Sequence, residues 1–156
     1  MKAITLHQPW ASLIAAGYKQ VETRSWPTTY RGPIVIHAGR TSPAEGMTAV
    51  DDALRAVSGQ LLGTRVIDDL WRTVYPLGCI VAVADIVDCV RMTEETIAEA
   101  GPLERALGDW RVDRYAWELA NVRPIEPIVV RGAQGIWGLD AATSAEVAGA
   151  LAMGVH

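Results

Sequence analysis

The sequence is poor in the residues that hold metals. Its 156 residues include two cysteines, no CxxC pair and three histidines, one of which, His156, is the last residue. A structural zinc site needs four ligands of these types, so the sequence offers too few candidates. We interpret Cys79 and Cys89 as small buried hydrophobic residues of a reducing compartment, with a disulfide or a metal pair as the alternative. We expect no metal and no cofactor.

Long apolar runs are also missing. No stretch approaches the roughly 18 to 20 residues that a membrane span needs. The chain opens with MKAITLHQPW, in which a His-Gln pair stands where a signal peptide would need its apolar segment. We therefore expect a cytoplasmic protein without a membrane partner. Hydrophobic residues make up 50% and charged residues 21% of the chain, which is typical of one globular domain.

An excess of basic charge is absent overall but present locally. The net charge of −4 argues against an indiscriminate binder of duplex nucleic acid, which normally has a broad basic surface. Residues 1–40 nevertheless contain five basic side chains and one acid, whereas the other 116 residues contain nine basic and seventeen acidic groups. The N-terminal third is therefore the expected location of a site for an anionic partner.

The spacing of apolar residues predicts strands that are separated irregularly by helices. Alternating or continuous apolar runs predict strands at 2–6, 19–24, 34–38, 78–90, 115–119, 128–130 and 136–139. Helical spacing predicts helices at 9–17, 43–57, 64–75, 144–153 and shortly after Thr93, the second of them starting at a capping box of Ser42 and Glu45. Pro124 and Pro127 are expected to interrupt the chain between two strands. The pattern indicates an α+β fold, a mixed β-barrel with helices packed outside it.

His7, Gln8 and Trp10 stand at the predicted junction between the first strand and the first helix. Such a junction exposes backbone N–H groups and favours anions. An amide and an imidazole can read the hydrogen-bonding edge of a base, and an indole can stack on its face. The alternative is structural, with Trp10 as a core anchor of the helix and His7 as its cap.

The segment Gly17–Arg24 places Lys19, Glu22, Thr23 and Arg24 together just after the first helix ends. On a regular strand Glu22 and Arg24 share one face, and Thr23 lies on the other. Glu22 and Arg24 would ordinarily form an ion pair. Lys19 could instead contact a phosphate, or act as a base if burial lowered its pKa. Spacing alone does not decide between these roles.

Arg31 and Arg40 place a basic residue near each end of the predicted strand at 34–38, which contains His37. A histidine inside an apolar strand is more often a satisfied core residue than a ligand. The two arginines add to the basic charge of the N-terminal third, so they are candidates for contacts with phosphate.

Asp85 interrupts the apolar strand at 78–90. A carboxylate in a central strand is costly unless it is paired. Lys19, Arg24 or His37 would serve as its partner, and such a paired charge in a pocket is a candidate functional site.

In their order and spacing, these motifs resemble one known family. The sequence is similar to the ASCH domain, named for activating signal cointegrator homology and part of the PUA-like superfamily, in residues 7–11, 17–19, 21–24, 31–32, 37–38, 78–81, 85–88, 117, 127–128 and 135–137. The resemblance predicts an ASCH domain at 1–140 with a helical insert at about 42–76. A helical tail at 141–156 would follow and could be a dimer contact, with the oligomeric state left open.

The resemblance implies a β-barrel whose cleft is lined by the first helix, the Gly-x-Lys segment and the central acidic strand. It implies binding of RNA or DNA, or hydrolysis, since some small bacterial members hydrolyse the amide of N4-acetylcytidine and others are described as ribonucleases. In the amidohydrolase branch the motif is Gly-x-Lys-x-x-Thr-x-Arg, and a strand acid completes the active groups. Lys19, Arg24 and Asp85 match this pattern. Glu22 stands where the threonine belongs, and Thr23, one residue later, faces the opposite side of an extended chain.

We therefore predict a module that binds RNA, single-stranded DNA or a modified nucleoside. The predicted binding residues are polar, basic and aromatic side chains of the N-terminal third: His7, Gln8, Trp10, Lys19, Glu22, Thr23, Arg24, Trp26, Arg31, His37 and Arg40. The alternative is a hydrolase in which Lys19 and Asp85 exchange protons and Glu22 orients or activates water. A third interpretation is purely structural and makes the charged motif an internal ion-pair network.

Overall fold

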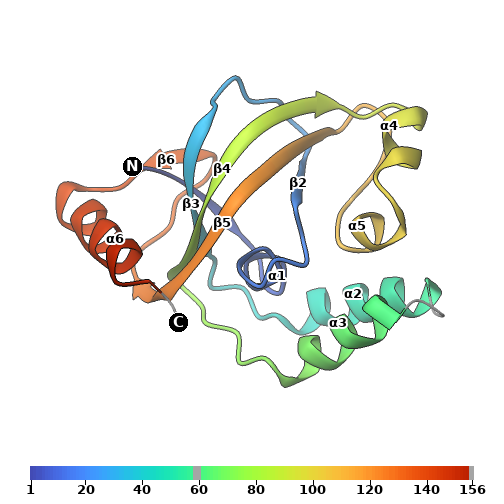
Figure 1. Cartoon of the computed structure of the whole chain (residues 1–156), viewed down its shortest axis with the longest axis horizontal. Coiled ribbons are helices and arrows are strands. Elements are labelled where there is room, and N and C mark those ends of the chain that lie inside the picture. The colour runs from blue at the N-terminus through green and yellow to red at the C-terminus, as the bar shows by residue number, and fades with distance from the viewer. Residues whose placement is uncertain (58–60, 155–156) are drawn as a thin grey trace.

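Six strands form one mixed sheet. The computed structural model describes residues 1–57 and 61–154, with the backbone alone for 61–64. The strands are Lys2–Leu6 (β1), Val21–Arg24 (β2), Gly32–Ala38 (β3), Cys79–Arg91 (β4), Tyr115–Val129 (β5) and Ile136–Gly138 (β6). Their spatial order is β2-β5-β4-β3-β1-β6 (Figure 1). The predicted strands at 2–6, 34–38 and 78–90 are confirmed.

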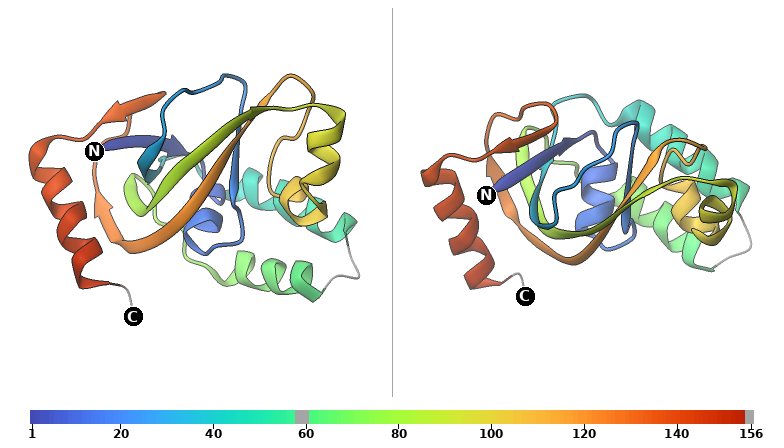
Figure 2. Two further views of the ribbon diagram at one scale, coloured as in Figure 1. Left: turned by 45° about the horizontal axis from the view of Figure 1, so that its top comes forward. Right: turned by 90° about the horizontal axis from the view of Figure 1, so that it is seen from above.

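The sheet curls into a half-barrel. β1 and β3 run parallel, whereas the other neighbouring strands run antiparallel. The two turned views show the strands wrapping around a central helix (Figure 2). β2 and β6 are the two ends of the strand order, so the curl is not closed by strand pairing. The α+β fold with a mixed sheet is confirmed, as a half-barrel. Membership of the PUA-like superfamily stays a prediction.

Two helices pack on opposite faces of the sheet. The helix α1 (Trp10–Ala15) lies inside the curve, where Ala11 and Ile14 belong to the same buried cluster as Ile4 of β1. The helix α6 (Ala141–Met153) packs on the outer face through Val147, which is fully buried. α1 therefore departs from the predicted arrangement of helices outside the barrel, because its apolar residues fill the concave face.

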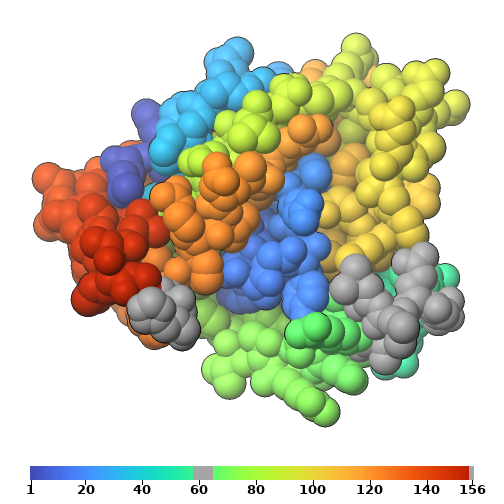
Figure 3. All heavy atoms as spheres, in the orientation of Figure 1, coloured from blue at the N-terminus to red at the C-terminus, as the bar shows by residue number. Residues whose placement is uncertain are grey.

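The other four helices form two further groups. α2 (Ala44–Ala56) and α3 (Leu61–Arg72) lie between β3 and β4 in sequence, and they pack against each other. α4 (Glu94–Glu99) and α5 (Pro102–Ala106) connect β4 to β5, and the space-filling view places them at the opposite end of β5 from α6 (Figure 3). The helices predicted at 43–57 and 64–75 are confirmed, but their description as an insert stays a prediction. α5 has only five residues and was not predicted.

Two local predictions are wrong. β5 continues through Pro124 and Pro127 instead of breaking there. Beyond Leu119 this strand pairs with β4 but not with β2, so the missing proline N–H groups lie on an edge, where they are tolerated. Ser42 does not form a side-chain capping box, since Pro43 occupies the N-cap position of α2. A capping box does form at α4, where Thr93 is the N-cap residue.

The remaining features concern single residues and helix length. Cys79 is buried on β4, and burial raises the pKa of its thiol, while Cys89 is half-buried. His156 lies outside the described residues. Within the ranges 1–57 and 61–154, no helix has the length and apolar character that crossing a membrane requires.

Candidate functional site

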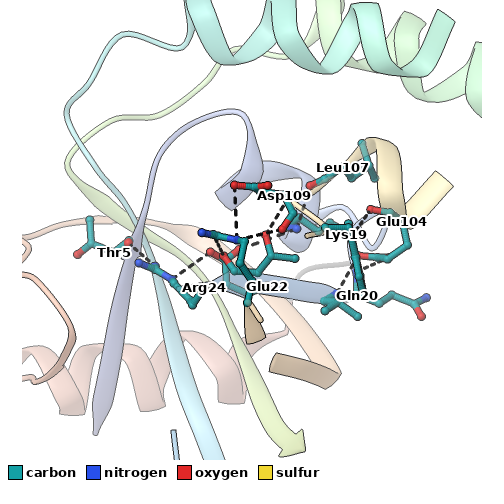
Figure 4. A network of polar contacts seen from close by, with 12 residues as sticks. Thr5, Lys19, Gln20, Glu22, Arg24, Glu104, Leu107 and Asp109 are labelled. Carbon is teal, nitrogen blue, oxygen red and sulfur yellow. Dashed lines mark hydrogen bonds and ion pairs between the residues drawn. The ribbon is translucent and has the colours of Figure 1, made fainter. Parts of the chain in front are cut away.

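Lys19, Glu22 and Arg24 form a line of charges along β2 and the turn before it (Figure 4). The turn contains Gly17, whose φ of 82° is a conformation that glycine adopts readily. Lys19 Nζ lies 3.9 Å from Glu22 Oε2, and Arg24 Nε lies 3.1 Å from Glu22 Oε1. Arg24 also donates a hydrogen bond from Nη2 to the Thr5 carbonyl oxygen, at 3.0 Å. Glu22 and Arg24 thus share one face of β2, as predicted.

The first two members of this line are buried. The Lys19 side chain is 1% exposed, and its Nζ donates a hydrogen bond to the Leu107 carbonyl oxygen at 2.9 Å. Burial lowers the pKa of the Lys19 amine, while the nearby Glu22 and Glu104 carboxylates oppose that shift. Burial likewise raises the pKa of the Glu22 carboxyl, against the influence of Lys19 and Arg24. The free-energy cost of removing the Lys19 and Glu22 charges from water is offset by the opposite charges beside them.

A cavity of about 360 Å³ lies beside the Lys19–Glu22 pair. Its described lining includes the polar or aromatic side chains of Trp10, Lys19, Glu22, Thr23, Arg105, Asp109 and Arg114. We call it the lysine cavity. Its carboxylates face its cations, since Arg114 Nε lies 3.5 Å from Asp109 Oδ2. The Thr23 hydroxyl accepts a hydrogen bond from the Asp109 backbone N–H at 3.0 Å, and so it anchors the loop after α5.

A larger cavity of about 820 Å³ lies on the other side of Arg24. Its described lining consists of Thr5, His7, Arg24, Trp26, His37, Gly39, Arg40 and residues 131–135. We call it the arginine cavity. Three of its described lining residues are arginines and none of them is a carboxylate. The local potential is therefore positive although the whole chain is acidic.

One of the three arginines, Arg24, is held in place by contacts within the protein. Glu22 and the Thr5 carbonyl oxygen position Arg24, whose Nε is buried with its N–H out of line for a hydrogen bond to Glu22. The Arg40 side chain passes directly over Gly78, where an added Cβ would come within 2.9 Å of Arg40 Nε. Gly78 also has a φ of 65°, which disfavours other residues. Arg24 is thus positioned by the protein before any ligand arrives, whereas Arg40 is exposed and packs over Gly78.

Trp26 forms an aromatic part of the arginine cavity. Its ring meets the buried Trp117 ring edge to face, with 4.7 Å between the ring centres. Trp117 Nε1 also donates a hydrogen bond to the Trp26 carbonyl oxygen at 3.2 Å. The Arg24 guanidinium carbon lies 6.0 Å from the Trp26 ring centre. Trp26 is therefore anchored yet half-buried, and its indole lies next to a cation.

His7 and His37 also line the arginine cavity, and only His7 is exposed. His37 Nε2 lies 2.9 Å from the Val130 carbonyl oxygen, and Nδ1 lies 3.2 Å from Thr5 Oγ1. Burial lowers the pKa of His37, the hydrogen bond to Val130 opposes this shift, and the Arg40 charge adds to it. His37 is thus a satisfied buried histidine, which the sequence favoured, that also forms part of a cavity wall.

Two predicted binding residues lie outside the linings of both cavities. Gln8 is 1% exposed, and its Nε2 donates to Ser12 Oγ at 2.8 Å and to the Pro76 carbonyl oxygen at 3.0 Å. Its Oε1 accepts from the Ser12 N–H at 3.0 Å, so the whole amide is used inside the protein. Arg31 is exposed and forms a surface ion pair with Asp88 at 3.2 Å. The structure does not bring these two side chains to the others.

The predicted partner of Asp85 is wrong. Asp85 Oδ1 lies 3.7 Å from Arg123 Nη2, and Asp85 Oδ2 accepts a hydrogen bond from Asn121 Nδ2 at 2.9 Å. Its neighbours Ala84 and Ile86 both face the inner core beside α1. Because side chains alternate along a strand, Asp85 points to the outer face, away from Lys19 and Arg24. His37 is on the same face, but it lies opposite Ile80, whereas Asp85 lies opposite Pro33. It lines neither cavity.

The sequence-based site also missed several residues. Arg131 and the turn that follows it line the arginine cavity, although they lie about a hundred residues after Arg24. The only sequence signal was a basic residue immediately before a glycine-containing turn, Gly132–Gly135. Arg105 and Arg114 of the lysine cavity had no distinguishing pattern at all.

Comparison with known proteins identifies the class. Residues 4–129, which include the charged segment of β2 and the strands β2 to β5, match the family model of the ASCH domain. This match covers more than half of the chain, and the chain therefore belongs to the ASCH domain family. The predicted resemblance is confirmed.

Individual relatives agree with this assignment. The chain is 37% identical over 89 residues to activating signal cointegrator 1 of Mus musculus, and 34% identical over 88 residues to that of Homo sapiens. Each match covers 56% of this chain but 14% of the relative, so this chain corresponds to a small part of those proteins. A crystal structure of ASCH from Zymomonas mobilis is similar in fold, with a TM-score of 0.58 at 17% identity. It covers 95% of this chain and 93% of the other. A mutant form of the same Zymomonas mobilis protein gives a TM-score of 0.58 at 16% identity and covers 95% of this chain and 96% of the other.

Proposed function

We propose that this ASCH domain binds single-stranded nucleic acid, RNA or DNA, in the arginine cavity. The observation that supports the proposal most directly is the charge of the described lining, which contains three arginines and no carboxylate. Cations gathered in a concave site attract an anionic ligand, and guanidinium groups match phosphate oxygens in a bidentate geometry. Nucleic acid is a polyanion whose bases can also stack on an aromatic side chain such as Trp26.

The shape and contents of the cavity favour a single strand over a duplex. A volume of about 820 Å³ suits a small molecule or a few groups of a larger one, and not the width of a double helix. Trp26 presents a half-buried indole beside Arg24. Proteins that bind single strands combine a positive groove with aromatic rings on which unpaired bases stack. In this proposal Trp26 stacks on a base, while Arg24, Arg40 and Arg131 contact phosphate.

The direct test is binding of fluorescently labelled single-stranded RNA and DNA of the same sequence, measured by anisotropy at several salt concentrations. Each phosphate contact contributes about 0.7 to the slope of log K against log salt for a single strand. Arg40→Ala and Arg131→Ala should each weaken binding about tenfold and reduce that slope by about 0.7. The matched control is Arg72→Ala, an exposed arginine of α3 that is not in the lining of the cavity.

Three outcomes are informative. Losses confined to the two cavity arginines support the proposal, and a preference between the RNA and DNA strands identifies the ligand. Equal affinity of Arg40→Ala, Arg131→Ala and the unsubstituted protein contradicts the proposal. Equal losses for Arg72→Ala indicate attraction by general charge, and they contradict it as well.

A second candidate function is hydrolysis in the lysine cavity. The observation that favours it is a buried amine, Lys19, with a lowered pKa beside the carboxylate of Glu22, both in the wall of a cavity of about 360 Å³. A lysine whose pKa is lowered by burial releases its proton more readily than an exposed lysine, and it can therefore act as a general base. N4-acetylcytidine is one candidate substrate, and RNA is the other.

This candidate is tested by incubation of the protein with N4-acetylcytidine and, separately, with end-labelled RNA. Product that forms with the unsubstituted protein and is lost in Lys19→Met supports a hydrolase, provided that circular dichroism shows a folded variant. Absence of product from both substrates contradicts it.

A further inference from the structure

His37 is held in one hydrogen-bonding state. The Val130 carbonyl can only accept, so His37 Nε2, 2.9 Å away, must be the protonated nitrogen. In the neutral ring Nδ1 is then an acceptor, and the Thr5 hydroxyl, 3.2 Å away, is its donor. The arrangement therefore matches a neutral imidazole with its proton on Nε2.

The same chain of hydrogen bonds extends to β6. Trp137 Nε1 donates to Thr5 Oγ1 at 3.2 Å, so this hydroxyl accepts from the indole and donates to His37. The His37 and Trp137 rings also meet edge to face, with 5.6 Å between their centres. Meanwhile the Thr5 carbonyl oxygen accepts from Arg24. Thr5 thus links the histidine to an arginine of the cavity.

The loop after β5 is seated directly on His37. An added Cβ on Gly132 would lie 2.5 Å from His37 Cε1 and 2.8 Å from Thr5 Oγ1, so only glycine fits here. On the other side of this contact, the Val130 N–H donates to the Gly78 carbonyl oxygen at 3.1 Å. Both the N–H and the carbonyl of Val130 are therefore fixed immediately before Arg131.

Other charged groups near the imidazole are basic. Arg40 affects its titration from the end of β3, and Arg24 and Arg131 line the same cavity from β2 and from the loop. No carboxylate among the described lining residues faces the ring. Burial and the Arg40 charge disfavour a second proton on His37, and so they preserve the hydrogen-bonding state that holds the loop.

We propose that His37, through Val130 and Gly132, is a positioning residue that places Arg131 in the wall of the arginine cavity. This inference rests on the proposed binding of single-stranded nucleic acid. His37 contacts no phosphate in this scheme. It acts by keeping the Arg131 backbone in place before the ligand binds. Binding then does not have to order the loop, which would weaken the affinity.

The test is a double-mutant cycle with the labelled single strand. Gly132→Ala pushes against the His37 ring and should weaken binding about tenfold, the effect of one lost charge-assisted contact. If His37 acts through Arg131, adding Arg131→Ala to Gly132→Ala should cause little further loss. Adding Arg40→Ala should instead multiply the losses, because Arg40 belongs to the segment after β3 and not to the loop after β5. The salt slope of Gly132→Ala should fall by about 0.7, as for Arg131→Ala, an effect that loss of stability alone does not produce.

A gentler variant guards against misfolding. Thr5→Val keeps the shape of the side chain but removes the hydroxyl that donates to His37, and Thr5→Ser restores it. We expect Thr5→Val to weaken binding and Thr5→Ser to recover most of the loss, with melting temperatures measured for both. Full affinity in Thr5→Val, or multiplied losses for Gly132→Ala with Arg131→Ala, overturns the positioning role while the cavity remains the binding site. Unchanged affinity of Arg40→Ala and Arg131→Ala overturns the proposed function itself.

Discussion

The two cavities on either side of β2 use similar residues in opposite ways. In the lysine cavity two of the three described cations face carboxylates, with Lys19 beside Glu22 and Arg114 beside Asp109. In the arginine cavity no carboxylate appears among the described lining residues, and the one acid that supports it, Glu22, lies behind Arg24. Paired charges stabilise the protein, whereas unpaired charges at a concave surface are available to a ligand. The contrast separates a structural role from a binding role within one short segment.

Glu22 connects the two cavities, because it lines the lysine cavity and forms an ion pair with Arg24 of the arginine cavity. Its carboxylate forms ion pairs with Lys19 and with Arg24. The neutralisation of Lys19 lets the chain bury an amine, and the contact with Arg24 aims a guanidinium at the larger cavity. In the motif Lys-x-x-Glu-x-Arg, one carboxylate therefore both stabilises a buried lysine and orients an arginine of the proposed binding site.

The largest expected effect follows from removal of that carboxylate. Glu22→Ala leaves the buried Lys19 without its partner and should lower the free energy of unfolding by about 3–5 kcal/mol. The control, Asp88→Ala, removes the exposed ion pair with Arg31 and should cost less than about 1 kcal/mol. Urea unfolding monitored by circular dichroism measures both values. Similar losses for the two variants would show that the buried network contributes no more than a surface pair.

The next prediction separates the cavities by their ligands. Arg40→Glu reverses a charge in the arginine cavity and should weaken binding of a single strand by at least about 1.4 kcal/mol, or tenfold. Arg105→Glu makes the same change at an exposed arginine of the lysine cavity and should change the affinity little. Anisotropy at low salt measures both. If the Arg105 variant loses more affinity than the Arg40 variant, the assignment of the two cavities is reversed.

The third prediction concerns pH. The pKa of His37 lies below its ordinary value of 6.5 because the ring is buried, so the unfolded chain binds its proton more tightly than the folded chain does. The stabilising effect of the neutral ring is complete above pH 6.5 and is lost as pH falls toward the lowered pKa. The free energy of unfolding should therefore decline below pH 6.5, and His37→Gln should flatten the decline. His7→Gln, which changes an exposed histidine, should retain it. Parallel pH profiles for the two variants would exclude His37 as the cause.

The difference between the two cavities could be predicted only in part. Local spacing was sufficient to predict most strands and helices, since their apolar residues recur at regular intervals. It also placed Glu22 and Arg24 on one face of β2, because alternation along a strand is a local property. The division of the charged residues into two cavities depends on the loop after α5, which lines the lysine cavity, and on the loop after β5, which lines the arginine cavity. Both loops are far from β2 in the chain.

Long-range contacts account for the specific errors. Arg131 reaches the arginine cavity because the long, curved β5 carries the following loop back to β1 and β3, which no local pattern predicts. Gln8 looked like a base-reading amide, but its partners Ser12 and Pro76 include one that is 68 residues away. The excess of basic residues in the N-terminal third correctly indicated Arg24 and Arg40 as cavity residues. It could not indicate Arg131, which comes from the C-terminal part of the chain.

The smallest expected effect tests the boundary of the site. Asp85 lies on the outer face of β4 with Arg123 and Asn121, so Asp85→Asn should lower the free energy of unfolding by less than about 1 kcal/mol. Its affinity for a single strand should stay within about twofold of the unsubstituted protein, because no contact connects it to either cavity. Urea unfolding and anisotropy measure the two quantities on one preparation. A large loss of binding or of hydrolysis in this conservative variant would mean that the surface around Asp85 takes part in function. The two cavities would then no longer account for the whole site.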